Sequence, residues 1–163
     1  AKAHAAGVGA TIDCEIGGQF PDSGGPAIPV HATVEQLSDG QFVCTGPMFG
    51  GLTANLGPTA RLGVRQGGAD ITIVVSSNRA QNADQEMLRH IGVELETQKM
   101  IVVKSAIHFL AAYEPIAEEV ILVEAPGANP CRIDTIPYTR LRPGLRLGPN
   151  GPVFKGPAPD GTP

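Results

Sequence analysis

Residues 101–109 read Ile-Val-Val-Lys-Ser-Ala-Ile-His-Phe, and they decide how the second half of the chain is interpreted. The β-branched run that opens this stretch predicts a strand. Ser105 is a suitable N-cap for a helix over 106–114, which would place His108 near the third helical position. Free backbone N–H groups and the helix dipole meet at such a junction, so it can bind an anionic group. Lys104 adds a full positive charge there, and the junction is our first candidate site.

The residues of this junction also have an ordinary structural explanation. A Lys-Ser pair between a strand and a helix can serve only to turn the chain and cap the helix. A single histidine on a helix is more often packed and hydrogen-bonded than bound to a metal ion. Lys104, Ser105 and His108 are therefore candidates, and both explanations stay open at this stage.

The first half of the chain predicts antiparallel strands joined by tight turns. Polar and apolar residues alternate through it with the period of two that is typical of a half-buried strand. Asp39-Gly40 and Gln66-Gly67-Gly68 are turn sequences that favour hairpins. The strands expected from this pattern cover residues 7–16, 29–37, 41–45, 59–64 and 69–76.

The second half predicts helices as well as strands. An amphipathic helix over 84–91 ends at Gly92, a typical C-terminal stop. A strand over 101–103, a helix over 106–114 and a strand over 120–123 would form a right-handed parallel βαβ unit. The chain as a whole predicts a mixed α+β / α/β fold in a single domain, with antiparallel β-hairpins in the first half followed by the βαβ unit.

Composition and charge exclude several classes of function. The chain has 163 residues, of which 42% are hydrophobic, so it can form one globular domain with a real core. Its formal net charge of -4 argues against nucleic-acid binding. No apolar run approaches the roughly 20 residues of a membrane span, and the opening Ala-Lys-Ala-His is no signal peptide. Residues 1–6 look like the end of a helix, and we expect the chain to be a piece of a larger protein.

Cysteine and histidine spacing indicates no complete metal site in this chain. Cys14, Cys44 and Cys131 are far apart and lack CxxC spacing, which favours reduced thiols in a cytoplasmic protein. There is no HExxH motif, and the four histidines share no metal-ligand spacing. Asp13 and Glu15 lie two apart on one face of an expected strand, where a solvated surface explains them better than an acid–base pair does.

Several short motifs resemble, in the same order, the C-terminal domain of the microcystinase C (MlrC) family. The most specific motifs are Val102-Val103-Lys104-Ser105 with His108-Phe109, Glu114-Pro115-Ile116-Ala117 and Ala125-Pro126-Gly127. Others are Gly7-Val8-Gly9-Ala10-Thr11, Leu37-Ser38-Asp39-Gly40 and Gly57-Pro58-Thr59-Ala60. We therefore expect residues 1–142 to form an MlrC-like C-terminal domain and residues 143–163 to form a Pro- and Gly-rich tail.

The resemblance implies the C-terminal half of a two-domain, zinc-dependent metallopeptidase or amidohydrolase. The family is named for opening peptide bonds in linearised microcystin, and most of its members are expected to act on other peptides or amides. Its zinc is held by Asp and His residues of an N-terminal domain, so the expected partner of this chain is that domain of the same protein. This chain would hold no zinc by itself and would complete the cleft for the peptide substrate.

Five residues of this chain are then candidates for the cleft. His108 would donate a hydrogen bond to the developing oxyanion and Lys104 would stabilise it electrostatically, so both are catalytic candidates. Ser105, Arg79 and Gln81 would bind substrate, and the forked guanidinium of an arginine suits a peptide carboxylate. Arg79 and Gln81 are explained equally well as a loop-bracing arginine and a surface glutamine.

The alternative is a non-catalytic function, either as a ligand-binding module or as an oligomerisation module. Exposed strands of the first half could pair across a homo-oligomer. The gene sequence before Ala1 separates the two hypotheses. A preceding domain with an Asp-x-His pair and a further histidine would favour the enzyme, whereas a start codon at that point would favour the module.

Overall fold

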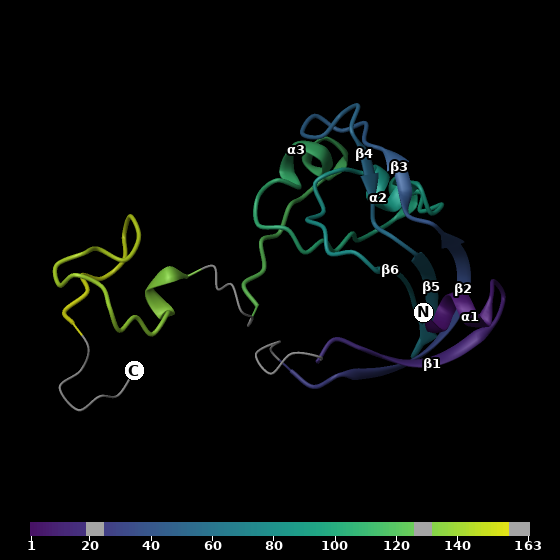
Figure 1. Ribbon diagram of the computed structural model, residues 1–163, viewed down its shortest axis with the longest axis horizontal. Helices are drawn as coiled ribbons and strands as arrows, with labels where there is room; N and C mark the ends of the chain where they lie inside the picture. The colour runs from purple at the N-terminus through teal and green to yellow at the C-terminus, as the bar shows by residue number, and fades with distance from the viewer. Residues whose placement is uncertain (19–24, 126–131, 157–163) are drawn as a thin grey trace. The chain divides into compact units, whose positions relative to one another are not determined.

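The computed structural model describes residues 1–18, 25–125 and 132–156 and divides the chain into two compact units. Unit 1 comprises Ala1–Ile16 and Ile28–Ile121, and unit 2 comprises Gly17–Ala27 and Leu122–Pro163. Every strand and α-helix of the described residues belongs to unit 1, which therefore carries the fold (Figure 1). The expected Pro126 and Cys131 features lie outside the described residues.

A four-stranded antiparallel sheet forms the larger layer of unit 1 (Figure 1). Its strands, in spatial order, are β1 (Thr11–Ile16), β2 (Ile28–Ser38), β5 (Thr59–Gln66) and β6 (Ala69–Ser76). All four were expected from the alternating pattern, with ends that differ by a few residues. Gly67 and Gly68 join β5 to β6 with φ angles of 60° and 82°, the left-handed values that a type I′ turn requires and glycine adopts without strain.

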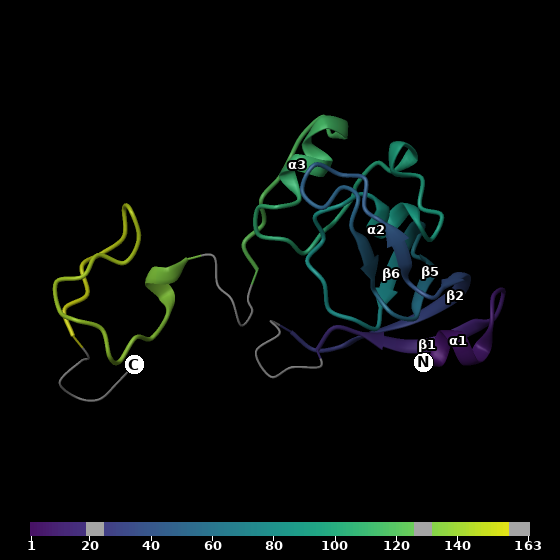
Figure 2. The same ribbon diagram turned by 45° about the horizontal axis from the view of Figure 1, so that its top comes forward.

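The alternation of residues along these strands places one apolar face of the sheet in the first hydrophobic core. Helix α1 (Lys2–Ala6) lies beside β1 and β2 in both views and adds Ala3 to this core (Figures 1 and 2). Because successive side chains of a strand point to opposite faces, the residues of β2 and β5 that enter this core are two positions apart. The strand residues of the core are Ile12, Ala32, Val34, Ala60, Leu62 and Val64.

A second, smaller sheet corrects one sequence prediction. The Asp39-Gly40 turn was expected to join 29–37 and 41–45 in a hairpin. Instead, β3 (Gln41–Val43) pairs with β4 (Thr53–Asn55). In place of β3, β5 pairs with the end of β2 next to this turn, from Thr33 to Ser38. Beyond Gly40 (φ 79°) the chain therefore leaves the large sheet, and the Gly40 carbonyl accepts a hydrogen bond from the Leu56 N–H at 2.9 Å.

Short helices make up the other end of unit 1 and enclose a second hydrophobic core. Its buried members are Leu95, Phe109, Ala112 and Tyr113. Figure 1 shows α2 and α3 on the side of β3 and β4, away from β1. The helical elements are α2 (Glu86–Arg89), η1 (Leu95–Thr97), α3 (Leu110–Tyr113) and η2 (Glu114–Ile116). As predicted, Gly92, with φ 76°, follows the end of the helix that starts after Asp84.

The predicted βαβ unit is wrong. Residues 101–103 and 120–123 form no strand, and the expected helix over 106–114 shortens to α3 and η2. Ser105 consequently caps no helix, and His108 precedes α3 instead of lying within it. A strand needs a hydrogen-bonded neighbour, and within the described ranges the backbone of 99–106 and of 118–125 makes no backbone–backbone hydrogen bond.

The mixed α+β class in a single small domain is nevertheless confirmed, since both antiparallel sheets and the short helices lie together in unit 1. In the described part of unit 2, η3 (Ile133–Thr135) is followed by one β-bridge between Arg146 and Val153. None of the helices in the described ranges is both long and apolar enough to cross a bilayer.

Candidate functional site

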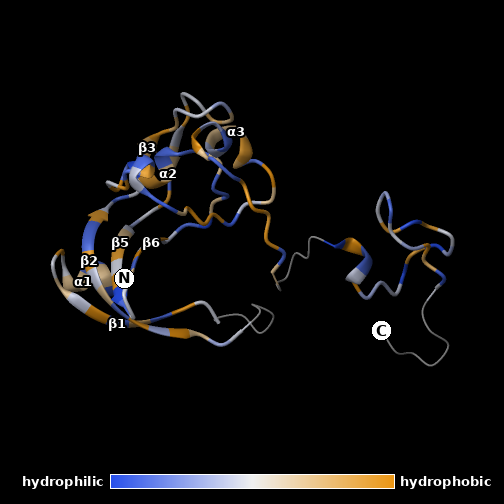
Figure 3. Cartoon of the chain, turned by 180° about the vertical axis from the view of Figure 1, so that it is seen from behind, coloured by the Kyte–Doolittle hydropathy of each residue, from blue (hydrophilic) through white to orange (hydrophobic). Residues whose placement is uncertain are grey.

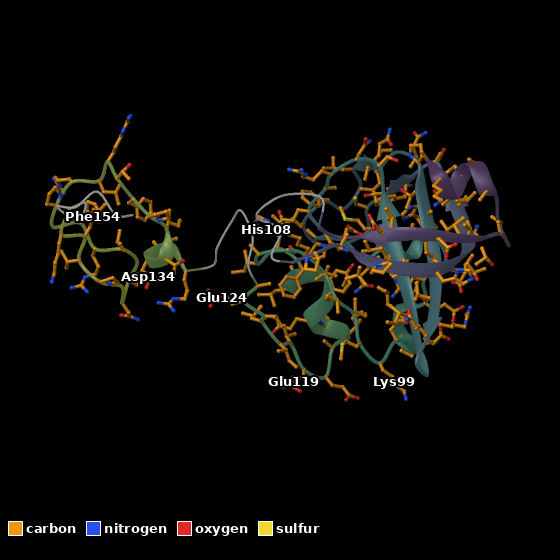
Figure 4. All side chains as sticks on the ribbon, turned by 90° about the horizontal axis from the view of Figure 1, so that it is seen from below. Lys99, His108, Glu119, Glu124, Asp134 and Phe154 are labelled. Atoms are coloured by element: carbon orange, nitrogen blue, oxygen red, sulfur yellow. The ribbon has the colours of Figure 1, made fainter. Side chains whose placement is uncertain are left out.

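Three of the five predicted site residues meet on the surface of unit 1. The side chain of Gln81, in the loop after β6, connects the other two. Its Nε2 donates a hydrogen bond to Ser105 Oγ at 3.1 Å, and its Oε1 lies 2.8 Å from His108 Nδ1. Gln81 and His108 are exposed and Ser105 is half-buried, so a ligand can reach all three, and Figure 4 shows where His108 lies on unit 1.

The Gln81 amide fixes the hydrogen-bonding state of its two neighbours. Because Oε1 only accepts, the His108 Nδ1 must carry the hydrogen between them. The neutral His108 ring therefore presents a lone pair on Nε2, and only the imidazolium form donates from that atom. Ser105 Oγ accepts the Gln81 N–H and keeps its own hydrogen free to donate. The site thus offers one acceptor and one donor side by side.

Lys104 and Arg79 are close to this group in sequence. Both side chains are exposed. Within the ranges that the structure describes, neither makes a side-chain hydrogen bond or an ion pair. They remain candidate cations for a ligand, and the structure does not assign either of them to the Gln81–Ser105–His108 group.

A hydrogen bond between Tyr113 and Asn82 holds the two segments of the site together. The buried Tyr113 hydroxyl, on α3, donates to Asn82 Oδ1 at 2.8 Å and lies 3.3 Å from the Asp84 carbonyl. Burial is the main cause that raises the pKa of Tyr113 to about 12. The phenol therefore stays protonated and keeps donating across the physiological range. Since Asn82 adjoins Gln81, this bond fixes the distance between the loop and the turn that carries His108.

The Asp84 carboxylate also holds this loop in place through hydrogen bonds to backbone N–H groups. This fully buried side chain accepts the Gly46 N–H through Oδ2 at 2.8 Å and the Glu86 N–H through Oδ1 at 2.9 Å. A Cβ on Gly46 would lie 2.9 Å from Asp84 Oδ2, so the close approach requires glycine. Burial, followed by the Asp84 charge, raises the pKa of the Cys44 thiol. Cys44 is thus a protonated packing residue and a poor nucleophile.

Comparison with known proteins decides the family. The model of the family described as MlrC C-terminus matches residues 1–140 of the chain. The chain belongs to the MlrC C-terminal family. Its fold is also similar to the crystal structure of a protein from Mesorhizobium sp. BNC1 named "putative metallopeptidase", with a TM-score of 0.73 and 27% sequence identity.

That similarity covers 87% of this MlrC C-terminal domain and 28% of the Mesorhizobium protein, so the chain spans less than a third of that relative. The comparison with curated proteins gives no match. The family and the name of the relative associate this domain with metallopeptidases, and the match itself concerns only the C-terminal part.

The described residues of this MlrC domain do not fit a zinc ion. Within residues 1–18, 25–125 and 132–156, no three His, Cys, Asp or Glu side chains lie close enough together to hold a metal. The other histidines have different partners. His4 contacts the Thr59 carbonyl at 3.1 Å, His31 contacts Asp13 at 2.6 Å, and His90 contacts the Glu86 carbonyl at 2.8 Å.

Sequence reasoning missed the supporting residues Asn82, Asp84 and Tyr113. One signal was present, because Asn82-x-Asp84 directly before an amphipathic helix is typical of a capping loop. Nothing local indicated that Tyr113, 31 positions from Asn82, would be its hydrogen-bond donor.

Proposed function

We propose that this MlrC C-terminal domain forms one wall of the substrate cleft in a zinc-dependent hydrolase of peptide or other amide bonds. Linearised microcystin is one candidate substrate. The zinc would be held by an N-terminal domain of the same protein. The observation that carries the proposal is the Gln81 side chain, which holds Ser105 and His108 together at the surface. The name of the Mesorhizobium relative supports the reaction class.

The donor and acceptor of this group are complementary to a peptide group. A peptide bond presents one carbonyl acceptor and one N–H donor. The free hydrogen of Ser105 can bind the carbonyl oxygen, and Nε2 of neutral His108 can accept from an amide N–H. In its imidazolium form, His108 instead donates to a developing oxyanion, as the sequence analysis proposed. Gln81 acts through Ser105 and His108 and is a positioning residue.

Lys104 and Arg79 would add charge recognition. Both are exposed cations near the group in sequence, and a guanidinium can bind a carboxylate through two parallel hydrogen bonds. We propose that they bind a carboxylate of the peptide substrate, and that Lys104 also stabilises negative charge that develops during hydrolysis.

We also propose a cytoplasmic location. Cys14 and Cys44 are free thiols in the structure, as expected in a reducing compartment. Fractionation of the source cells, followed by detection of the protein with an antibody, tests this proposal.

Steady-state kinetics of the full-length, zinc-loaded protein on a panel of peptides and amides tests the proposed function. His108→Ala should lower kcat/KM about a hundredfold, the usual effect of removing one transition-state hydrogen bond. Gln81→Leu should also lower kcat/KM, and the double variant should lose less than the product of the two single effects, because Gln81 acts in part through His108. His31→Ala, another exposed histidine paired with a side chain, is the matched control and should leave the kinetics unchanged.

Full activity of both His108→Ala and Gln81→Leu would contradict the proposal. The chain would then be a non-catalytic module for ligand binding or assembly. An additive double variant would contradict the positioning role of Gln81 while leaving His108 in the cleft.

A further inference from the structure

Two apolar runs are exposed among the residues that the structure describes, and the second runs from the end of unit 1 into unit 2. In the first, Met100 and Val102 are 81% and 86% exposed. In the second, Ile121, Leu122 and Val123 are 71%, 72% and 76% exposed. Figure 3 shows the second run as a hydrophobic stretch between α3 and the grey residues. Contiguous exposed apolar side chains of this kind mark an interaction surface.

The burial pattern of the first run is that of a strand without neighbours. Ile101 and Val103 pack against the second core, while Met100 and Val102 point away from it. This alternation has the period of two that extended backbone produces. Among the described residues, no backbone group of 99–106 pairs with another backbone group. Toward the rest of the described chain, one side-chain face and both hydrogen-bonding edges of this run are therefore unpaired.

The second run has the composition of a strand that is buried on both faces. Residues 120–123 are Val-Ile-Leu-Val, without polar alternation, and such continuous runs are typical of strands inside parallel sheets. Charged residues bound both runs, with Lys99 and Lys104 around the first and Glu119 and Glu124 around the second. In Figure 4, Lys99 and Glu119 point outward from unit 1. Charges that flank an apolar strand keep its ends in water.

In the similar crystal structure this fold is part of a much longer chain. It matches 87% of this chain, yet the match is 28% of that protein, so there the same fold is joined to a much larger remainder. The first run also leads directly into Lys104 and Ser105. A domain that covers 100–103 would border the candidate site, and ligand sites are common at domain interfaces.

We propose that residues 100–103 and 120–123 become β-strands by adding to an apolar sheet edge of the preceding domain in the same protein. The backbone groups that are free in this chain would supply the ladder hydrogen bonds, and Met100, Val102 and residues 121–123 would supply the apolar contacts. This inference rests on the proposed function only in naming that domain as the partner.

Hydrogen–deuterium exchange of the full-length protein, read by mass spectrometry, tests the inference. The backbone amides of 100–103 and 120–123 should exchange at least about a hundredfold more slowly than an unstructured chain. Val102→Lys should return 100–103 to fast exchange and leave the protection of β2 and β5 unchanged. Val43→Lys, at another exposed valine, on β3, is the matched control and should change neither run.

Fast exchange of both runs in the wild-type full-length protein would overturn the inference. Protection that disappears on dilution would overturn it as well, because the cover would then be a second copy of the chain. The kinetic and exchange results separate the two proposals. If both runs are protected and the His108→Ala variant is fully active, the interface is supported and the proposed function is contradicted. If the runs are unprotected and the variant is inactive, the proposed function is supported and the interface is contradicted.

Discussion

Substitution of Tyr113 by Phe tests the hydrogen bond that holds the site together. The variant keeps the aromatic ring in the second core, so it creates almost no cavity. It removes only the hydroxyl that donates to Asn82 Oδ1 at 2.8 Å and lies 3.3 Å from the Asp84 carbonyl. Two acceptors in a part-buried setting then lose their donor.

The structure sets the size of the effect. An intramolecular hydrogen bond contributes about 1 kcal/mol net to stability, and a buried acceptor left without a donor costs about 1–3 kcal/mol. Tyr113→Phe should therefore lower the free energy of unfolding by roughly 1–2 kcal/mol near neutral pH. The effect should also depend on pH. The pKa of Tyr113 is raised in the folded state, from 10.0 to about 12, so the folded state favours the protonated phenol.

The sign of this pH dependence follows from linkage. The stabilisation from the phenol is complete below about pH 10 and is lost as the pH rises through about 12. Full conversion of the pKa difference would give about 2.7 kcal/mol, and partial solvent access to the hydroxyl reduces this to roughly 1–2 kcal/mol. The difference in unfolding free energy between the wild type and Tyr113→Phe should shrink by that amount between these two pH values.

Urea unfolding of both proteins at pH values below 10 and near 12 measures the difference, and near-ultraviolet phenolate absorbance reports the ionisation itself. Tyr138→Phe is the control for the loss of a tyrosine elsewhere, because Tyr138 is the other tyrosine in the sequence. Equal stability of the wild type and Tyr113→Phe at neutral pH would refute the contact with Asn82, and parallel pH dependence of the two proteins would refute the raised pKa of Tyr113, whose main cause is burial.

Three further predictions concern the framework. Leu62→Ala in the first core should lower the free energy of unfolding by about 2–5 kcal/mol in urea titrations, whereas Leu52→Ala at an exposed position should change it by less than about 0.5 kcal/mol. Gly67→Ala at φ 60° should destabilise the β5–β6 hairpin by roughly 1 kcal/mol, and unchanged thermal stability would contradict the turn assignment. Asp84→Asn should lower the pKa of Cys44, seen as faster alkylation by iodoacetamide at mildly alkaline pH, and an unchanged rate would show that burial alone sets that pKa.

The sequence was sufficient for the parts of the fold that depend on local patterns. The β5–β6 hairpin follows from alternation on both sides of Gln66-Gly67-Gly68, because strand period and turn residues act over a few positions. The pairing of β3 was not predictable in this way. Asp39-Gly40 has the local signature of a hairpin, but the edge of β2 that β3 would need is occupied by β5, which is about twenty positions further along the chain.

The candidate site was likewise predictable only in part. The family motifs identified Ser105 and His108, and the structure places both on Gln81, at separations of 24 and 27 positions. The residues that hold this arrangement were missed, because Tyr113 meets Asn82 only after α3 packs into the second core. The strand predictions for 101–103 and 120–123 failed in this chain because β propensity expresses a fit to neighbouring strands, and the described residues supply none.

Lys104 directly follows the first apolar run, so a domain that covers the run would also change the electrostatic environment of Lys104. Two unit charges about 4 Å apart interact by about 1 kcal/mol in water and about 4 kcal/mol at an effective dielectric constant near 20. Lys104 is exposed in this chain, so its attraction for a carboxylate is close to the lower value. Cover from a domain docked on residues 100–103 would exclude water from the adjacent Lys104 and strengthen the same charge several-fold. The proposed docking would therefore do more than bury Met100 and Val102, because it would strengthen the charge of Lys104, the residue that we propose stabilises negative charge during hydrolysis.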